Sequence, residues 1–221
     1  KDGLPGPFHL VHLGSRALGG AGLVLAEATA VLPEGRMTPG DTGLWNDEQT
    51  AAWKQITDFV HAQSTARVGL QLNHAGRRGS TQLGWEQPDH PLPEGNWPLV
   101  SASAEPYLEG ISQVPQVLSE AALQAICQAF VAATRRAAEA GFDWLEIQAG
   151  HGFLVRDDAA VKLGEGVFHG VLLAGWFGGF SLAFPWDARP GRKVSGSAYF
   201  CMSLICSSLR FTPCTVMVVS P

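Results

Sequence analysis

The order of secondary-structure patterns in the first 150 residues restricts the fold of this chain more than any other feature. Three short apolar runs, at residues 23–30, 68–72 and 142–147, alternate with two long segments whose apolar residues recur at helical spacing. This strand–helix–strand–helix–strand order is typical of parallel βαβ units with right-handed crossovers. We therefore expect an α/β fold in which the three strands lie parallel and adjacent in one sheet.

The two long helical segments carry their own start signals. Asn46 is expected to cap the first helix, with Gln49 at the capping-box position, and Ser119 is expected to cap the second. A shorter helix is expected over residues 8–18. Residues 76–115 are rich in Pro, Gly and Trp without periodicity, and a loop of that length in a compact domain is usually functional. The inward-facing residues expected for the two long helices are Ala52, Trp53, Ile56, Phe59, Val60, Leu123, Ile126, Phe130 and Val131.

Composition and charge exclude several classes of protein. A net charge of -5 and the lack of a basic stripe argue against a nucleic-acid-binding surface. Four Cys without a CxxC pair give no zinc signature, and Cys127 is expected to be a buried structural thiol. His9 and His12 have no third ligand nearby, so we expect no metal site.

The uncharged run at 167–186 contains four glycines and Pro185, which argues against a membrane span. The chain opens on a turn-rich loop rather than a signal peptide, so we expect a cytoplasmic protein.

Polar residues stand at the ends of two of the expected strands. Gln71 stands near the end of one run, which is followed by a polar loop containing Gly76, and Gln148 directly follows another run and precedes His151. In α/β barrels the chemistry lies at the carboxyl ends of the strands. A Gln amide can donate and accept hydrogen bonds in one plane, which suits the edge of a planar heterocycle. Together the two strand ends point to a flavin-type barrel site.

Several motifs occur in an order that resembles the Old Yellow Enzyme family of NADH:flavin oxidoreductases. The resemblance covers roughly residues 2–154 and implies a (β/α)8 TIM barrel that uses FMN and NAD(P)H. A narrower resemblance, at residues 80–86 and 93–98, is to the reductase domain of aromatic-acyl-CoA monooxygenase-reductases acting on 2-aminobenzoyl-CoA or salicylyl-CoA. The motifs that carry the family resemblance are His9–Ala17, Glu27–Val31, Pro33–Arg36, Leu44–Gln49, Gln71–Arg77 and Ala140–Ile147.

The resemblance implies roles for individual residues. Gln71 would hydrogen-bond the pyrimidine edge of the flavin, and Ala28 would offer the same ring a backbone contact. His151 would help to hold the carbonyl oxygen of the substrate and so stabilise a developing enolate. The family usually has His at the position of Gln148, which can donate a hydrogen bond but carries no charge. It usually has a Tyr proton donor at the position of Phe153, which has no proton to give.

The resemblance ends near Leu154. Residues 155–221 show no clear period and no helix caps, and the later strands and phosphate-binding loops of the family are not recognisable there. We therefore expect a partial barrel over residues 1–154 and an irregular C-terminal tail over 155–221 that does not belong to the family, as a frameshift or a mispredicted junction would produce. The chain also lacks an initiating Met, so it is expected to begin inside a longer protein.

Two functional hypotheses follow from this organisation. The first is an FMN-dependent NAD(P)H oxidoreductase or ene-reductase, expected to be truncated, that acts on an activated alkene or an aromatic acyl-CoA and forms a homo-oligomer. A variant of this hypothesis is a module whose barrel is completed by a partner chain. The second is a non-enzymatic half-barrel remnant that binds no flavin. The sequence alone leaves both open.

Overall fold

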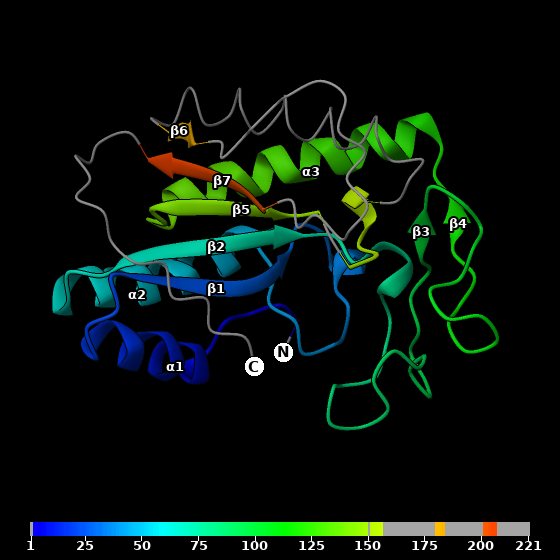
Figure 1. Ribbon diagram of the computed structural model, residues 1–221, viewed down its shortest axis with the longest axis horizontal. Coiled ribbons are helices and arrows are strands. Elements are labelled where there is room, and N and C mark those ends of the chain that lie inside the picture. Colours follow the sequence, from blue (N-terminus) through cyan, green and yellow to red (C-terminus); the bar gives the residue numbers. More distant parts are fainter. Residues whose placement is uncertain (1, 150, 157–179, 184–200, 207–221) are drawn as a thin grey trace, which may run out of the picture.

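The first three major strands form one parallel sheet, as the sequence predicts. The computed structural model describes residues 2–149, 151–156, 180–183 and 201–206. Strand β2 (Arg67–Asn73) lies between β1 (Leu23–Ala30) and β5 (Trp144–Gln148), and both pairings are parallel. Figure 1 shows the three strands running in the same direction, with their carboxyl ends toward the long loop that follows β2.

Three helices cover one face of this sheet. They are α1 (Pro7–Leu18), α2 (Asp47–Gln63) and α3 (Glu120–Glu139), and α2 and α3 lie behind the strands in Figure 1. Asn46 Oδ1 accepts from Gln49 N at 2.9 Å, and Ser119 Oγ accepts from Ala122 N at 3.2 Å, so both predicted caps are confirmed. Gln49 Oε1 accepts from Trp45 N at 2.8 Å rather than from the N–H of the capping residue itself.

The core lies between the helices and the sheet. Trp53 of α2 and Phe130 of α3 pack against Leu70, Leu72 and Leu145, all essentially inaccessible to solvent. The predicted free thiol of Cys127 is buried in the same cluster. Periodicity did not predict that Gln49 and Thr57 also lie on the buried face of α2. Both are tolerated there because their polar atoms have partners, including the bond from Thr57 Oγ1 to the carbonyl of Ala140.

The two faces of the sheet differ because successive side chains on a strand point to opposite sides. Leu70 and Leu72 face the helices and are fully buried, whereas Gln71 between them is half-buried on the opposite face. That opposite face would point inward if the strands closed into a barrel. In β2 and β5 it carries polar side chains, including those of Gln71, Glu146 and Gln148.

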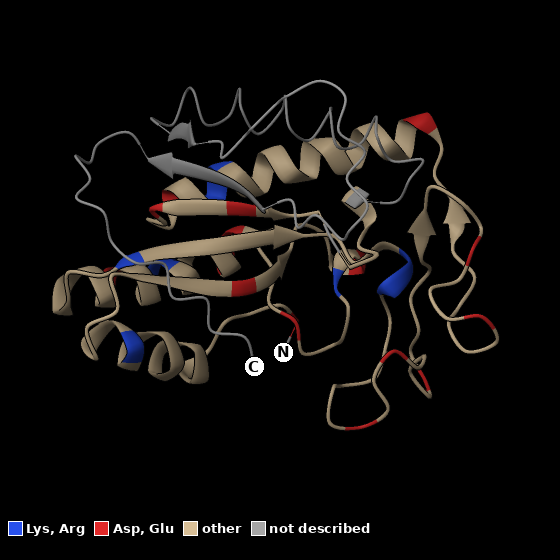
Figure 2. Cartoon of the chain, viewed as in Figure 1, with Lys and Arg blue, Asp and Glu red and all other residues tan. Residues whose placement is uncertain are grey.

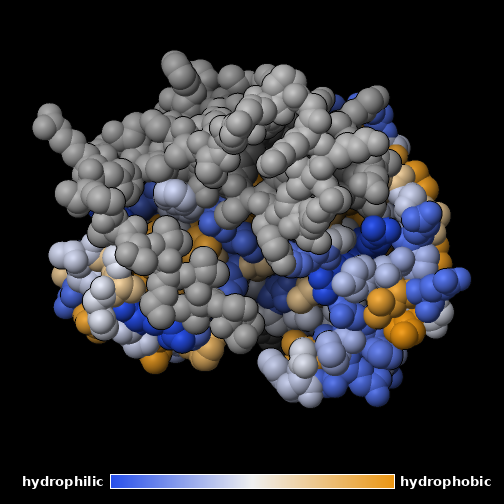
Figure 3. Space-filling view, in the orientation of Figure 1, coloured by the Kyte–Doolittle hydropathy of each residue, from blue (hydrophilic) through white to orange (hydrophobic). Residues whose placement is uncertain are grey.

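The long segment between β2 and α3 is irregular, as predicted. It contains the short helix η2 (Gly76–Arg78) and a small parallel pair of two-residue strands, β3 (Val100–Ser101) and β4 (Gln116–Val117). It lies beyond the carboxyl ends of the strands in Figure 1, and Figure 3 shows apolar as well as polar surface over this region. The exposed large apolar side chains of the segment are Trp85, Leu108, Ile111, Val114 and Val117.

Two short pieces of the tail extend the sheet in the antiparallel sense. Strand β7 (Cys201–Cys206) pairs antiparallel with β5, and β6 (Phe180–Ala183) pairs antiparallel with β7. The sequence predicted an irregular tail, and these strands were missed because they lack alternation. An open edge such as that of β5 offers unpaired backbone groups to any extended segment. Neither strand is a βα unit. Residues 157–179, 184–200 and 207–221, which include most of the run at 167–186, lie outside the described residues. The boundary after residue 154 stays a prediction.

Two expectations about partners concern the surface. Within the described part of the chain, Figure 2 shows acidic and basic residues scattered over helices, strands and loops rather than gathered into a basic stripe. In that same part, no helix has the length and apolar character needed to cross a membrane.

Candidate functional site

A row of polar groups crosses the three parallel strands near their carboxyl ends. Ala26 of β1 is opposite Leu70, and Thr29 is opposite Leu72, so the two residues between them face the single residue Gln71. Gln71 is in turn opposite Glu146 of β5. The Nε2 atom of Gln71 donates to Glu146 Oε2 at 3.3 Å, which is a long hydrogen bond.

The two residues opposite Gln71 are Glu27 and Ala28, and they form a β-bulge. A bulge leaves one residue out of the ladder and often lies next to an active site, where it redirects the backbone. Thr29 fixes this bulge, because its buried hydroxyl donates to Glu27 O at 2.9 Å and lies 3.0 Å from the hydroxyl of Thr42. The register therefore places the backbone of Ala28 opposite the Gln71 position of β2.

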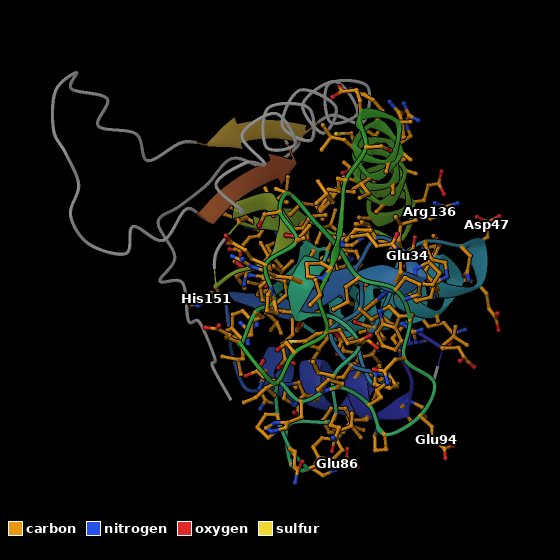
Figure 4. All side chains as sticks on the ribbon, turned by 90° about the vertical axis from the view of Figure 1, so that its right-hand side faces the viewer. Glu34, Asp47, Glu86, Glu94, Arg136 and His151 are labelled. Atoms are coloured by element: carbon orange, nitrogen blue, oxygen red, sulfur yellow. The ribbon has the colours of Figure 1, made fainter. Side chains whose placement is uncertain are left out.

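The end of β5 supplies the other predicted residues. Gln148 is the last residue of the strand and, two positions after Glu146, lies on the same face. His151 follows in a turn, is exposed, and has a left-handed backbone with φ of 55°. Figure 4, which looks at the carboxyl ends of the strands, shows His151 at the side of the sheet where β5 ends. All four predicted residues thus lie toward the same end of the sheet.

The loop that carries His151 is held against the loop that follows β2. Leu154 N donates to His74 O at 3.1 Å, and Arg78 Nη1 donates to His151 O at 2.9 Å. Phe153 lies between His151 and Leu154 in the chain and is buried, with 6% of its surface exposed. The position at which the resemblance expects a tyrosine hydroxyl is therefore filled by an apolar ring.

Sequence reasoning missed two buried polar residues at the end of β2. Asn73 is fully buried, and neither atom of its side-chain amide has a hydrogen-bond partner among the described residues. His74 is equally buried, its Nδ1 accepts from Gly76 N at 3.1 Å, and its Nε2 has no partner within the same part of the chain. Burial lowers the pKa of His74 to about 4. The only sequence signal that could have identified Asn73 and His74 was their position within the Gln71–Arg77 motif.

The geometry suits the edge of a planar ring that both donates and accepts hydrogen bonds. Apart from the long bond to Glu146, the Gln71 amide forms no hydrogen bond with described residues. Asn73 lies two residues further along the same face of the strand and has an unpartnered amide. A buried polar group without a partner is costly, so a ligand that pairs with these amides would be stabilised. The pyrimidine edge of a flavin has this pattern of donors and acceptors.

No metal centre competes with this interpretation in the part of the chain that the structure describes, where no three His, Cys, Asp or Glu residues are grouped to hold an ion. The Nδ1 atom of His9 instead accepts from Gly6 N at 3.0 Å in the first turn of α1.

Comparison with curated proteins gives relatives at substantial identity. The chain is 42% identical over 159 residues to an NADH:flavin oxidoreductase of Gibberella zeae, covering 70% of this chain and 38% of that protein. It is 38% identical over 157 residues to an NADPH dehydrogenase of Bacillus subtilis, covering 71% of this chain and 42% of that protein. The chain thus spans about two fifths of the length of these relatives.

Comparison with solved structures agrees with the predicted fold class. Morphinone reductase superposes with a TM-score of 0.63 and 27% identity, over 78% of this chain and 51% of that one. A structure described as TcOYE with pHBA gives a TM-score of 0.64 and 25% identity, over 78% of this chain and 55% of that one. These similarities confirm an α/β fold of parallel strands that corresponds to part of an Old Yellow Enzyme barrel.

A family model adds the last comparison, and it covers most of the predicted barrel segment. The model described as the NADH:flavin oxidoreductase / NADH oxidase family matches residues 2–159. That range contains the β1 bulge, the Gln71 strand end and the His151 turn. The chain therefore belongs to the NADH:flavin oxidoreductase / NADH oxidase family.

Proposed function

We propose that this chain contributes part of the active site of an FMN-dependent NAD(P)H oxidoreductase acting on activated alkenes. The observation that carries the proposal is the row formed by the Ala28 bulge and the Gln71 amide, with the unpartnered amide of Asn73 beside it. In this assignment Gln71 and the backbone of Ala28 hold the pyrimidine edge of the flavin. When bound, FMN supplies the redox chemistry, taking a hydride from NAD(P)H and passing it to the alkene.

The end of β5 would bind the substrate. An activated alkene is conjugated to a carbonyl group, and negative charge develops on the carbonyl oxygen as hydride adds to the β-carbon. The His151 ring and the Gln148 amide would donate hydrogen bonds to that oxygen and stabilise the enolate. The α-carbon then needs a proton. Because Phe153 has none, water would have to supply it at this position.

We also propose aromatic acyl-CoA as a substrate class. The support is the resemblance of residues 80–86 and 93–98 to aromatic-acyl-CoA monooxygenase-reductases. In this chain the segment is a compact loop closed by Asn96, whose Oδ1 lies 2.9 Å from Ser80 Oγ and accepts from Leu92 N at 3.1 Å. Glu86 and Glu94 lie on its outer side, far from His151 in Figure 4. The segment would therefore bind a part of the substrate that is distant from the reacting carbons.

One observation favours the rival function, a half-barrel remnant without activity. Strand β7 occupies the free edge of β5 in the antiparallel sense, whereas the next strand of a barrel would have to lie there in parallel. We therefore expect this chain alone to turn over little substrate. The edge of β5 is occupied, the chain has about two fifths of the length of its relatives, and Phe153 stands where the resemblance expects a tyrosine.

Anaerobic oxidation of NAD(P)H in the presence of added FMN and an activated enone distinguishes the two functions. The chain would be compared with free FMN and with the Gln71→Ala and His151→Ala variants. Turnover no greater than that of free FMN, together with bound flavin, agrees with an incomplete active site. Turnover well above free flavin that is lost in either variant would show that the site is complete in this chain. A chain that neither turns over substrate nor binds flavin supports the remnant.

A further inference from the structure

Three segments that are distant in the sequence meet at the side chain of Arg78. This residue lies in η2, directly after β2, and only 16% of its side chain is exposed. Its Nη1 donates to the backbone oxygen of His151 at 2.9 Å, and its Nη2 donates to Asp89 Oδ1 at 2.9 Å. The centre of its guanidinium lies 4.3 Å from the ring centre of Tyr107 and 5.4 Å from that of Phe153.

The turn that carries His151 is strained and closely packed. His151 has φ of 55°, a left-handed conformation that is uncommon for a residue other than glycine. Gly152 follows with φ of 78°, and a Cβ atom there would lie 3.1 Å from the Tyr107 ring. A strained backbone of this kind persists only where the surroundings determine it. Among the contacts that do so are the Tyr107 ring against Gly152, the Arg78 bond to the His151 carbonyl and the bond from Leu154 N to His74 O.

We propose that Arg78 is a positioning residue that fixes the His151 turn and thereby sets the place of the His151 ring in the substrate site. The proposal rests on the substrate role given to His151 above. A planar guanidinium can bond His151 O and Asp89 at the same time while its flat face lies close to the aromatic rings of Tyr107 and Phe153. Arg78 would not contact substrate, and its effect would pass through the backbone of His151.

The chemistry of the side chain predicts which replacement fails. A lysine at this position keeps the positive charge but presents a point ammonium, which cannot donate in two fixed in-plane directions as the guanidinium does. Arg78→Lys should therefore lose most of the positioning effect although the charge is retained. Arg135, an exposed arginine on α3, is the matched control, because Arg135→Ala removes the same side chain from the surface.

The first experiment needs neither flavin nor activity. In the isotopically labelled chain, the carbonyl carbon of His151 and the amide of Gly152 report by NMR on the hydrogen bond that His151 O accepts. We expect both resonances to shift in Arg78→Ala and Arg78→Lys, with Arg135→Ala unchanged. Unchanged resonances in the Arg78 variants would overturn the proposal. Should Arg78→Ala fail to fold, Arg78→Lys decides the question.

The second experiment tests whether the effect reaches the substrate. The FMN-loaded chain is titrated with 2-cyclohexen-1-one, and binding is followed through the change in flavin absorbance. Arg78→Ala should weaken binding about tenfold, the worth of one hydrogen bond from a charged group. His151→Ala should weaken it as much, and the double variant no more than His151→Ala alone. Additive losses, or no loss in Arg78→Ala, would contradict positioning through His151. Failure of the unmodified chain to bind FMN would count against the proposed function, while the NMR result would still decide the role of Arg78.

Discussion

Replacing His74 with glutamine should remove a large part of the dependence of folding stability on acid pH. His74 has 1% of its surface exposed, and burial lowers its pKa from 6.5 to about 4. The folded chain therefore keeps the ring neutral at a pH at which the unfolded chain protonates it. Because the unfolded state then binds more protons, the free energy of unfolding falls as the pH decreases from 6.5 toward 4.

The size of the effect follows from the two pKa values. They differ by roughly 2.5 units, and each unit corresponds to 1.36 kcal/mol, so His74 should remove about 3 kcal/mol of stability between pH 6.5 and 4. Burial also lowers the pKa of His9, which adds to the same trend, and raises the pKa of Asp41, which opposes it. Both groups remain in the variant, so the difference between the two proteins isolates His74.

Urea unfolding at a series of pH values measures this difference. The original chain should lose stability steeply on acidification, whereas His74→Gln should lose about 3 kcal/mol less across the same range. His12→Gln, at a half-buried histidine on α1, is the control and should follow the original chain. An unchanged slope in His74→Gln would refute the reasoning, and so would a His74 ring that titrates near 6.5 by NMR.

Two further substitutions test the packing that supports the sheet. Asp143 accepts from Val68 N at 2.9 Å and also lies within 2.7 Å of His61 Nε2 and 3.2 Å of Arg67 Nη1. Asp143→Ala should therefore cost about 2 kcal/mol in urea unfolding. Asp58→Ala, which breaks only the exposed pair with Lys54, should cost under about 1 kcal/mol, and equal losses would contradict this ranking. An added Cβ at Gly43 would lie 1.9 Å from the Trp45 ring, so Gly43→Ala should cost about 1–3 kcal/mol by the same assay. At Gly84 an added Cβ would have no atom within 4 Å, so Gly84→Ala should leave the free energy of unfolding nearly unchanged. A smaller loss of stability in Gly43→Ala than in Gly84→Ala would be evidence against the packing described.

The parts of the fold that local chemistry determines could be predicted from the sequence. The caps at Asn46 and Ser119 and the apolar stripe around Trp53 are set within one or two helical turns, so they can be recognised without tertiary information. The parallel order of β1, β2 and β5 follows from the crossover rule.

The rest depends on contacts between distant segments. Periodicity could not indicate that Thr57 would be buried, because its bond to Ala140 crosses 83 positions of sequence. The antiparallel β7 depends on the open edge of β5 rather than on its own pattern. At the site, Gln71 was identifiable from its motif, whereas the opposing bulge at Ala28 appears only when two strands are set in register.

Binding of flavin by this chain tests the central claim most directly. FMN fluorescence is followed as the chain is added, and Gln71→Ala is compared with Gln55→Ala, an exposed glutamine on α2. We expect saturable quenching that Gln55→Ala leaves unchanged and that Gln71→Ala weakens about tenfold, as the loss of hydrogen bonds to the ring edge requires. No saturable quenching, or identical curves for the chain and Gln71→Ala, would contradict the assignment of the Ala28–Gln71 row to the flavin.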